Sequence, residues 1–172
     1  MATDNFTTCF LWTVGAEGGF TADPADSGNW TSGVVGAGEL RGTKFGISAA
    51  AYPALDIANL TLGQAEAIYQ ADYWPKIRGD ELPLPVARAT FDAAVNSGAG
   101  RAIQWLQSAA GVAPDGQLGP VTMAAIQAAD PVPLAVDALA ARLQFLGSLA
   151  VWERYGLGWA RRVLNLHAAI LG

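Results

Sequence analysis

The chain has 172 residues, of which 52% are hydrophobic and 15% are charged, and its formal net charge at pH 7 is -5. This length and composition suit one globular domain, or one domain with a small appendage, and exclude a disordered chain. The negative charge also excludes a nucleic-acid-binding protein, which would need a basic surface.

The sequence predicts neither a membrane-spanning segment nor a signal peptide. Its apolar runs are short and interrupted by charge, so we expect no stable insertion into a membrane. No basic residues precede the apolar segment that starts at Cys9, and Asp4 lies in their place, so we expect synthesis in the bacterial cytoplasm without a signal peptide. Cys9 and His167 are the only residues of their types. We therefore expect no disulfide, no metal and no cofactor.

The first third of the chain predicts one helix and a polar loop. Phe6, Phe10 and Val14 recur at helical spacing, and glycines from Gly15 onward end that helix. Residues 20–46 are rich in Gly, Asp, Asn and Thr, which favours a loop or a small hairpin. Residues 34–48, which overlap this range, predict two short strands with a turn near Ala37-Gly38.

The rest of the chain predicts helices. Thr61–Gln64 reads TLGQ, a capping box that opens a helix which must end at Pro75. Five more helices are predicted from prolines at helix starts, glycines at helix ends and the spacing of leucines. They cover about 85–97 and 101–110, a short segment from Pro120, a segment around 139–149, and 157–170. The predicted fold class is therefore mainly α, with a small β-hairpin beside the first helix.

Glu17 and Asp26 are candidate catalytic carboxyl groups. Glu17 follows the predicted first helix, where the backbone carbonyls and apolar neighbours both disfavour a charged carboxylate and raise its pKa, as a general acid requires. Asp26 follows after eight residues, on a loop polar enough to keep it ionised. One neutral and one charged carboxyl group are the parts needed to cleave a glycosidic bond. The alternative is that Glu17 is a surface residue at a frayed helix end.

Four long blocks, in order, resemble glycoside hydrolase family 108. They read AEGGFTADPADSGNW, GTKFGISAAAYPALDIANLT, AIYQADYWPKIRGDELP and FDAAVNSGAGRAIQWLQSAAGVAPDGQLGPVT. The resemblance implies a lysozyme-like helical domain, N-acetylmuramidase activity and Glu17 as the catalytic acid. It also implies a glycoside hydrolase region over residues 1–98 and a predicted peptidoglycan-binding region over 99–172, which we expect to pack together as one unit.

The chain departs from the shorter family pattern at residues 32–42, which are inserted. The insertion leaves two candidate threonines for positioning a water beside Asp26. Thr31 keeps the short spacing to Asp26, whereas Thr43 lies in the better-matching block GTKFGIS, and we favour Thr43. The alternative is that Thr43 only fills a strand. Asp23 lies on the same loop and is the substitute candidate for the base.

Several other side chains are candidates for binding the substrate. The Asn96 amide could bind an N-acetyl group, although it could equally cap a helix, and aromatic rings could stack on sugars, although such rings more often lie in a core. The substrate-binding candidates are Asn96, Trp30, Phe45 and Gln104. We expect Asp92 to be structural, and Arg161 and Arg162 to lie on a solvated helix face.

These features together predict an endolysin-type lysozyme. The expected reaction is hydrolysis of the β-1,4 bond between N-acetylmuramic acid and N-acetylglucosamine, with peptidoglycan as the partner and the periplasmic side of the cell wall as the place of action. We expect a monomer, with a holin as a candidate partner for release. One alternative is a lytic transglycosylase that uses Glu17 alone. Another is a non-catalytic protein that binds the cell wall or assists secretion.

Overall fold

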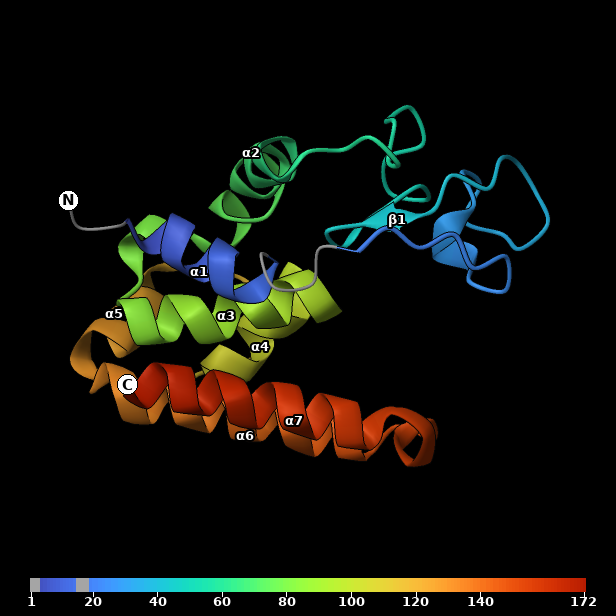
Figure 1. The fold of residues 1–172 in the computed structure, drawn as a ribbon. Helices are drawn as coiled ribbons and strands as arrows, with labels where there is room; N and C mark the ends of the chain where they lie inside the picture. The colour runs from blue at the N-terminus through green and yellow to red at the C-terminus, as the bar shows by residue number, and fades with distance from the viewer. Residues whose placement is uncertain (1–3, 15–18) are drawn as a thin grey trace. The chain divides into compact units, whose positions relative to one another are not determined.

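The computed structural model describes residues 4–14 and 19–172 (Figure 1). Glu17 therefore lies outside the described residues. Over the described ranges the chain forms seven α-helices, three short 3-10 helices and one two-stranded sheet, which confirms the mainly α class with a small hairpin. In chain order the elements are α1 (Asn5–Thr13), η1 (Ser27–Asn29), β1 (Thr43–Lys44), β2 (Ile47–Ser48), α2 (Leu62–Asp72), η2 (Pro75–Ile77), η3 (Gly79–Glu81), α3 (Leu84–Ser97), α4 (Ala99–Ala109), α5 (Pro120–Ala128), α6 (Pro131–Gly147) and α7 (Trp152–Leu171).

Local signals set several helix ends where the sequence predicts them, whereas α6 and α7 begin earlier than predicted, at Pro131 and Trp152 and not near residues 139 and 157. The Thr61 backbone N–H donates to Gln64 Oε1 at 2.9 Å, and the Gln64 N–H donates back to Thr61 Oγ1 at 3.3 Å, which completes the capping box of α2. Pro120 occupies the first position of α5. Gly111, two residues past the end of α4, has the left-handed φ of 69° that favours glycine there.

The hairpin lies later in the chain than expected. β1 and β2 pair antiparallel, with Thr43 opposite Ser48 and Lys44 opposite Ile47. Phe45 (φ 53°) and Gly46 (φ 76°) form its two-residue turn, in which both residues are left-handed. The prediction of the turn near Ala37-Gly38 is therefore wrong for the sheet. Long-range contact explains the difference, because the Tyr69 hydroxyl donates to the Phe45 carbonyl at 3.1 Å and fixes the turn there.

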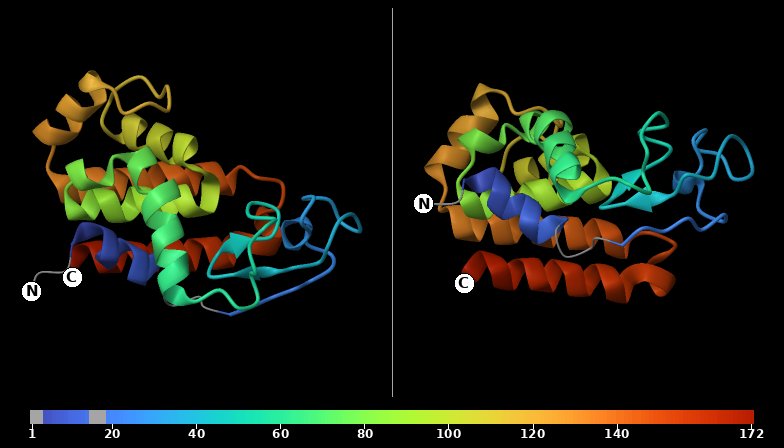
Figure 2. Two further views of the ribbon diagram at one scale, coloured as in Figure 1. Left: turned by 90° about the horizontal axis from the view of Figure 1, so that it is seen from above. Right: turned by 45° about the horizontal axis from the view of Figure 1, so that its top comes forward.

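The chain divides into two compact units, one of residues 1–9 with 72–172 and the other of residues 10–71. In the larger unit α3 packs against α4, α6 and α7, and α6 and α7 lie side by side (Figure 2). The buried residues of α3 include four alanines, which allow close helix approach. Phe6, Trp74 and Phe91 form an edge-to-face aromatic cluster, with ring centroids 5.4 to 6.1 Å apart. The division into regions at residue 98 stays a prediction.

The smaller unit has a core of its own. The Phe10 and Tyr69 rings lie 5.9 Å apart, and both side chains are fully buried. Ile47 of the hairpin and Ile57 of the following loop are also buried. This core supports the loop that carries Asp26.

Across both described ranges, no helix combines the length and the hydropathy that a bilayer span needs.

Candidate active site

Asp26 lies on an ordered turn. Its side chain is the N-cap of η1, where Oδ1 accepts a hydrogen bond from the Gly28 N–H at 2.9 Å. Asp23 makes a similar bond one turn earlier, with Oδ1 accepting from the Ala25 N–H at 2.9 Å. Both carboxyl groups are exposed to solvent. Asp26 can therefore meet a bound substrate or water without a change in the buried part of the fold.

Asn29 connects this turn to the hairpin. Its side chain is fully buried, with Nδ2 donating to the Asp23 carbonyl at 3.0 Å and Oδ1 accepting from Thr43 Oγ1 at 2.7 Å. The Asn29 carbonyl also accepts from the backbone N–H groups of Arg41 and Gly42. A buried amide with its donor and acceptor both used holds two segments in fixed register. The sequence predicted no role for Asn29, because an asparagine in a polar loop gives only a weak signal.

The two candidate threonines have different roles. Thr43 is half-buried on β1, and its hydroxyl donates to Asn29, three residues after Asp26. The Thr31 hydroxyl instead accepts from the Glu39 N–H at 2.9 Å and closes the inserted loop. Thr43 is thus tied to the turn that carries Asp26, while Thr31 is tied to the insertion.

Trp30 directly follows η1 and Phe45 lies in the turn of the hairpin, and both side chains are half-buried. Trp30 Nε1 donates to the Pro24 carbonyl at 2.9 Å, so the indole braces the Asp26 turn. Phe45 lies at the tip of the hairpin in a strained left-handed conformation, with Lys44 Nζ 5.5 Å from the centre of its ring. Strain of this kind gathers at functional sites, which marks the hairpin tip as a candidate substrate contact.

Asn96 and Gln104 belong to the other compact unit. Both are exposed, Asn96 near the end of α3 and Gln104 in the middle of α4. Asn96 Nδ2 donates to the Asp92 carbonyl at 2.9 Å, one turn back along the helix. The amide therefore has a local structural bond and still presents its oxygen.

Asp92 is structural, in agreement with the expectation from the sequence. Its carboxylate is fully buried and pairs with Arg142 Nη1 and Arg162 Nη2, each at 2.6 Å. The prediction that Arg162 lies on a solvated face is wrong, because only 17% of its side chain is exposed and it reaches inward to Asp92. Arg161 is exposed as expected.

Cysteine chemistry and metal binding are the other kinds of reactivity that the described residues could offer. Cys9 is buried, and burial raises the pKa of its thiol to about 12, which keeps it protonated and unreactive. In residues 4–14 and 19–172, no group of three or more His, Cys, Asp and Glu side chains is arranged to hold a metal ion. The exposed carboxyl groups on the Asp26 turn therefore remain the candidate catalytic groups among the described residues.

Comparison with known proteins agrees with this geometry. The family model described as Glycosyl hydrolase 108 matches residues 10–98, and the model described as Predicted Peptidoglycan domain matches residues 101–164. Among solved structures, Brucella abortus SagA superposes with a TM-score of 0.80 and 32% sequence identity, over 96% of this chain and 93% of that one. No curated protein matched the chain in sequence.

These matches make the protein a lysozyme-like glycoside hydrolase that acts on peptidoglycan. The chain belongs to glycosyl hydrolase family 108.

Proposed function

We propose that the protein is an N-acetylmuramidase that hydrolyses the β-1,4 bond between N-acetylmuramic acid and N-acetylglucosamine. Glu17 acts as the general acid and Asp26 as the general base. The observation that carries the proposal is the hydrogen-bonded turn around Asp26, which presents an exposed carboxylate and joins it through Asn29 to the Thr43 hydroxyl. A base held on a fixed turn suits a reaction that needs a positioned water.

The hydrogen bonds favour a specific role for each group on this turn. Asp26 uses Oδ1 for the N-cap, which leaves Oδ2 to take a proton from water. Thr43 donates its hydroxyl proton to Asn29 Oδ1, so the Thr43 oxygen is left to accept a hydrogen bond from the same water. Thr31 uses its oxygen to accept from Glu39, which supports Thr43 over Thr31.

The reaction follows from these roles. Glu17 protonates the glycosidic oxygen while Asp26 removes a proton from the water that attacks the anomeric carbon. Water on the opposite face from the acid gives inversion, which requires carboxyl groups about 6.5–9.5 Å apart. Trp30 and Phe45 contact sugar rings from the turn and the hairpin tip. Asn96 and Gln104 are further candidate substrate contacts.

Mass spectrometry of digested sacculi tests the reaction. Hydrolysis releases fragments with reducing N-acetylmuramic acid ends, whereas a lytic transglycosylase leaves 1,6-anhydro ends that are lighter by one water. Anhydro ends, or no cleavage, would each overturn the proposal. The Asp26→Asn variant should lose hydrolysis by about a hundredfold or more, since general base catalysis contributes roughly 10²–10⁴. Asp23→Asn is the matched control on the same loop and should retain activity.

The biological role is a further part of the proposal and rests on the family. The protein serves as a prophage-type lysis enzyme, made in the cytoplasm and acting as a monomer on the periplasmic side of the wall. A holin provides the route of release. Expression with and without a holin, followed by the optical density of the culture, tests this role, and lysis that is equally fast without the holin would contradict it.

A further inference from the structure

Three aromatic side chains gather at the start of α7, in the larger unit. The centroid of the Trp159 ring lies 6.2 Å from that of Trp152 and 5.8 Å from that of Tyr155. Their spacing of three, four and seven residues places all three on one side of the helix. Tyr155 is 45% exposed, and both indoles are partly exposed. These three rings form the aromatic cluster of α7, which is open to solvent.

The neighbouring residues of α7 are suited to hold this cluster. A Cβ at Gly156 would lie 2.5 Å from an atom of the Trp152 ring, so any residue other than glycine would displace that indole. Glycine weakens a helix relative to alanine, and here it keeps the ring in place. The exposed Arg154 guanidinium lies 5.1 Å from the centre of the Tyr155 ring and adds N–H donors at the edge of the cluster.

The polar ends of the three rings are free to meet a ligand. Trp30 and Trp74 donate their indole N–H groups to other parts of the chain. The indole N–H groups of Trp152 and Trp159 and the Tyr155 hydroxyl, by contrast, make no hydrogen bond within residues 4–14 and 19–172. Tyrosine and tryptophan usually find a hydrogen-bond partner when they are buried, and they are enriched at binding surfaces. The cluster therefore offers apolar ring surface together with unused hydrogen-bonding groups.

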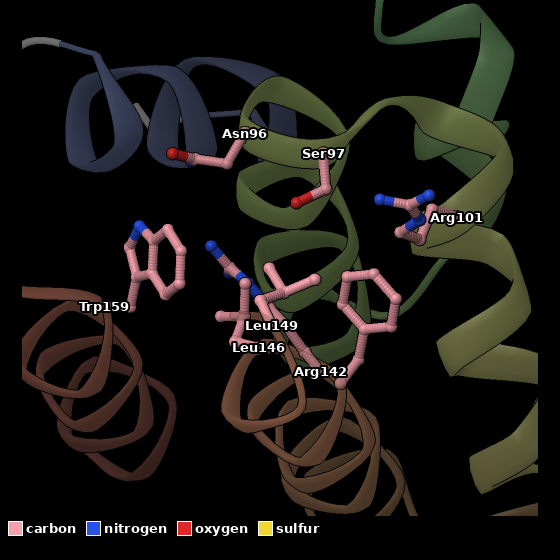
Figure 3. Close-up of a pocket in the computed structure, with 8 residues that line it drawn as sticks. Asn96, Ser97, Arg101, Arg142, Leu146, Leu149 and Trp159 are labelled. Atoms are coloured by element: carbon pink, nitrogen blue, oxygen red, sulfur yellow. The ribbon is translucent and has the colours of Figure 1, made fainter. Parts of the chain in front are cut away.

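The cluster borders a pocket of about 210 Å³, because Trp159 lines the wall of that pocket opposite the end of α3 (Figure 3). Asn96 Nδ2 donates to a carbonyl one turn back along α3, which leaves Asn96 Oδ1 to accept a ligand N–H. The Ser97 hydroxyl makes no hydrogen bond to any described residue and can donate to a ligand carbonyl. Leu146 and Leu149 add an apolar patch to the same wall.

An N-acetylated β-1,4-linked glycan matches the cluster and the pocket together. Its ring substituents are equatorial, so each sugar ring presents C–H bonds on its faces and hydroxyl groups at its rim. Its acetamido groups each carry one N–H, one carbonyl and one methyl group, which are the three partners that the pocket wall can accommodate. The arginines of that wall are already engaged, Arg142 by Asp92 and Arg101 by the Phe145 ring. The pocket therefore does not require a charged ligand.

We propose that the aromatic cluster of α7 binds the glycan strand of peptidoglycan, and that the adjoining pocket takes up the N-acetyl group of one sugar. Tyr155 and Trp159 stack on sugar rings. Asn96 Oδ1 accepts the acetamido N–H, and the Ser97 hydroxyl donates to the acetamido carbonyl. The inference rests on the proposed action on peptidoglycan, and it adds that the larger unit recognises the glycan and not the stem peptide.

The indole N–H signals in proton–nitrogen NMR spectra of the full chain test the inference, once Trp152→Phe and Trp159→Phe have assigned them. The first probe is the β-1,4-linked tetramer of N-acetylglucosamine, which lacks the bond that the proposed reaction cuts. It should shift the signals of Trp152 and Trp159 and leave unchanged the signal of Trp74, which is 3% exposed and donates to Asp80.

Two further probes separate the parts of the polymer. Cellotetraose has the same linkage with hydroxyl groups in place of the acetamido groups. It should bind at least about tenfold more weakly than the N-acetylated tetramer, because the acetamido hydrogen bonds are lost. The free stem tetrapeptide should leave the signals of Trp152 and Trp159 unchanged. Equal binding of the two tetramers, or shifts caused by the peptide and not by the N-acetylated tetramer, would overturn the inference.

Two variants of exposed side chains on α7 locate the site. Tyr155→Ser removes one ring of the cluster and should weaken binding of the N-acetylated tetramer by about tenfold. Leu157→Ser is the matched control, since Leu157 is 69% exposed and lies two residues further on, nearly on the opposite side of the helix. It should bind like the wild type, and equal melting temperatures establish that both variants fold. Wild-type binding by Tyr155→Ser, or unchanged signals of Trp152 and Trp159 in the wild type, contradicts the proposed site.

Failure of the catalytic proposal gives a different result. Digestion of sacculi reports hydrolysis, whereas the indole signals report the aromatic cluster and require no cleavage. Binding that depends on Tyr155 without any hydrolysis would support the cluster and refute the muramidase. Hydrolysis without such binding would do the reverse.

Discussion

Replacing Asp92 by Asn keeps the shape of the side chain and removes its charge, which leaves Arg142 and Arg162 without their shared carboxylate. The carboxylate is fully buried, and the Arg142 side chain is 4% exposed, so water cannot replace the lost partner at that arginine. Arg162 is 17% exposed and can regain part of its hydration. The loss should therefore arise mainly at Arg142.

The size of the effect follows from this burial. Removing one partner from a buried ion pair destabilises a protein by about 3–5 kcal/mol. Because Arg162 can rehydrate, we expect about 3 kcal/mol for Asp92→Asn. In a chain of this length each kcal/mol lowers the melting temperature by about 2–4 °C, which gives a fall of about 6–12 °C.

Urea denaturation followed by circular dichroism measures the free energy of unfolding, and calorimetry measures the melting temperature. Glu39→Gln is the matched control, since it removes a carboxylate from the exposed pair with Arg41, and such pairs contribute little. Replacing Asp92, Arg142 and Arg162 together by apolar residues of similar volume should recover most of the loss. An Asp92→Asn protein within about 1 kcal/mol of wild type would refute the reasoning.

Four further predictions concern the reaction and the fold. Glu17→Gln should lower turnover by at least about a hundredfold while thermal stability holds or rises slightly, and near wild-type clearing of peptidoglycan would remove Glu17 as the acid. Proton NMR of the nascent reducing sugar should show the α-anomer first, and a β-anomer would mean retention and exclude the Asp26 base. Exhaustive chelation should leave lysis unchanged, since one His and one Cys are too few for a three-ligand zinc site; activity lost on chelation and restored by zinc would contradict this. The Gln107 side-chain amide and the Gln117 N–H, which donate to Asp115, lower the pKa of that carboxyl group. The stabilisation from Asp115 should be present above the unfolded-state pKa and be lost as pH falls through the lower folded pKa. An NMR titration of the Gly116 amide would detect the folded pKa. A carboxyl group that titrates at its ordinary value would show that these hydrogen bonds do not form.

The sequence by itself determined which segments are helical and, at several helix ends, where the helix begins or stops. The capping box at Thr61 and Gln64, the proline that opens α5 and the glycine after α4 act over three or four residues, so they are readable without the fold. The four sequence blocks that resemble the family, in the same order, likewise predicted the family without the fold. Glu17 and Asp26 were candidates from their local surroundings, their spacing and the family resemblance, and their roles stay predictions.

Only the tertiary structure decided the contacts between distant residues. Arg162 lies 70 positions from Asp92, and nothing local to either residue distinguishes a buried ion pair from a solvated charge. Asn29 and Thr43 meet across the inserted residues, and the Tyr69 hydroxyl donates to the Phe45 carbonyl in the hairpin turn, which forms at Phe45-Gly46 and not at Ala37-Gly38. Such contacts depend on which faces of the chain are brought together in space, because desolvation and hydrogen-bond partners are properties of the assembled fold and not of neighbours in sequence.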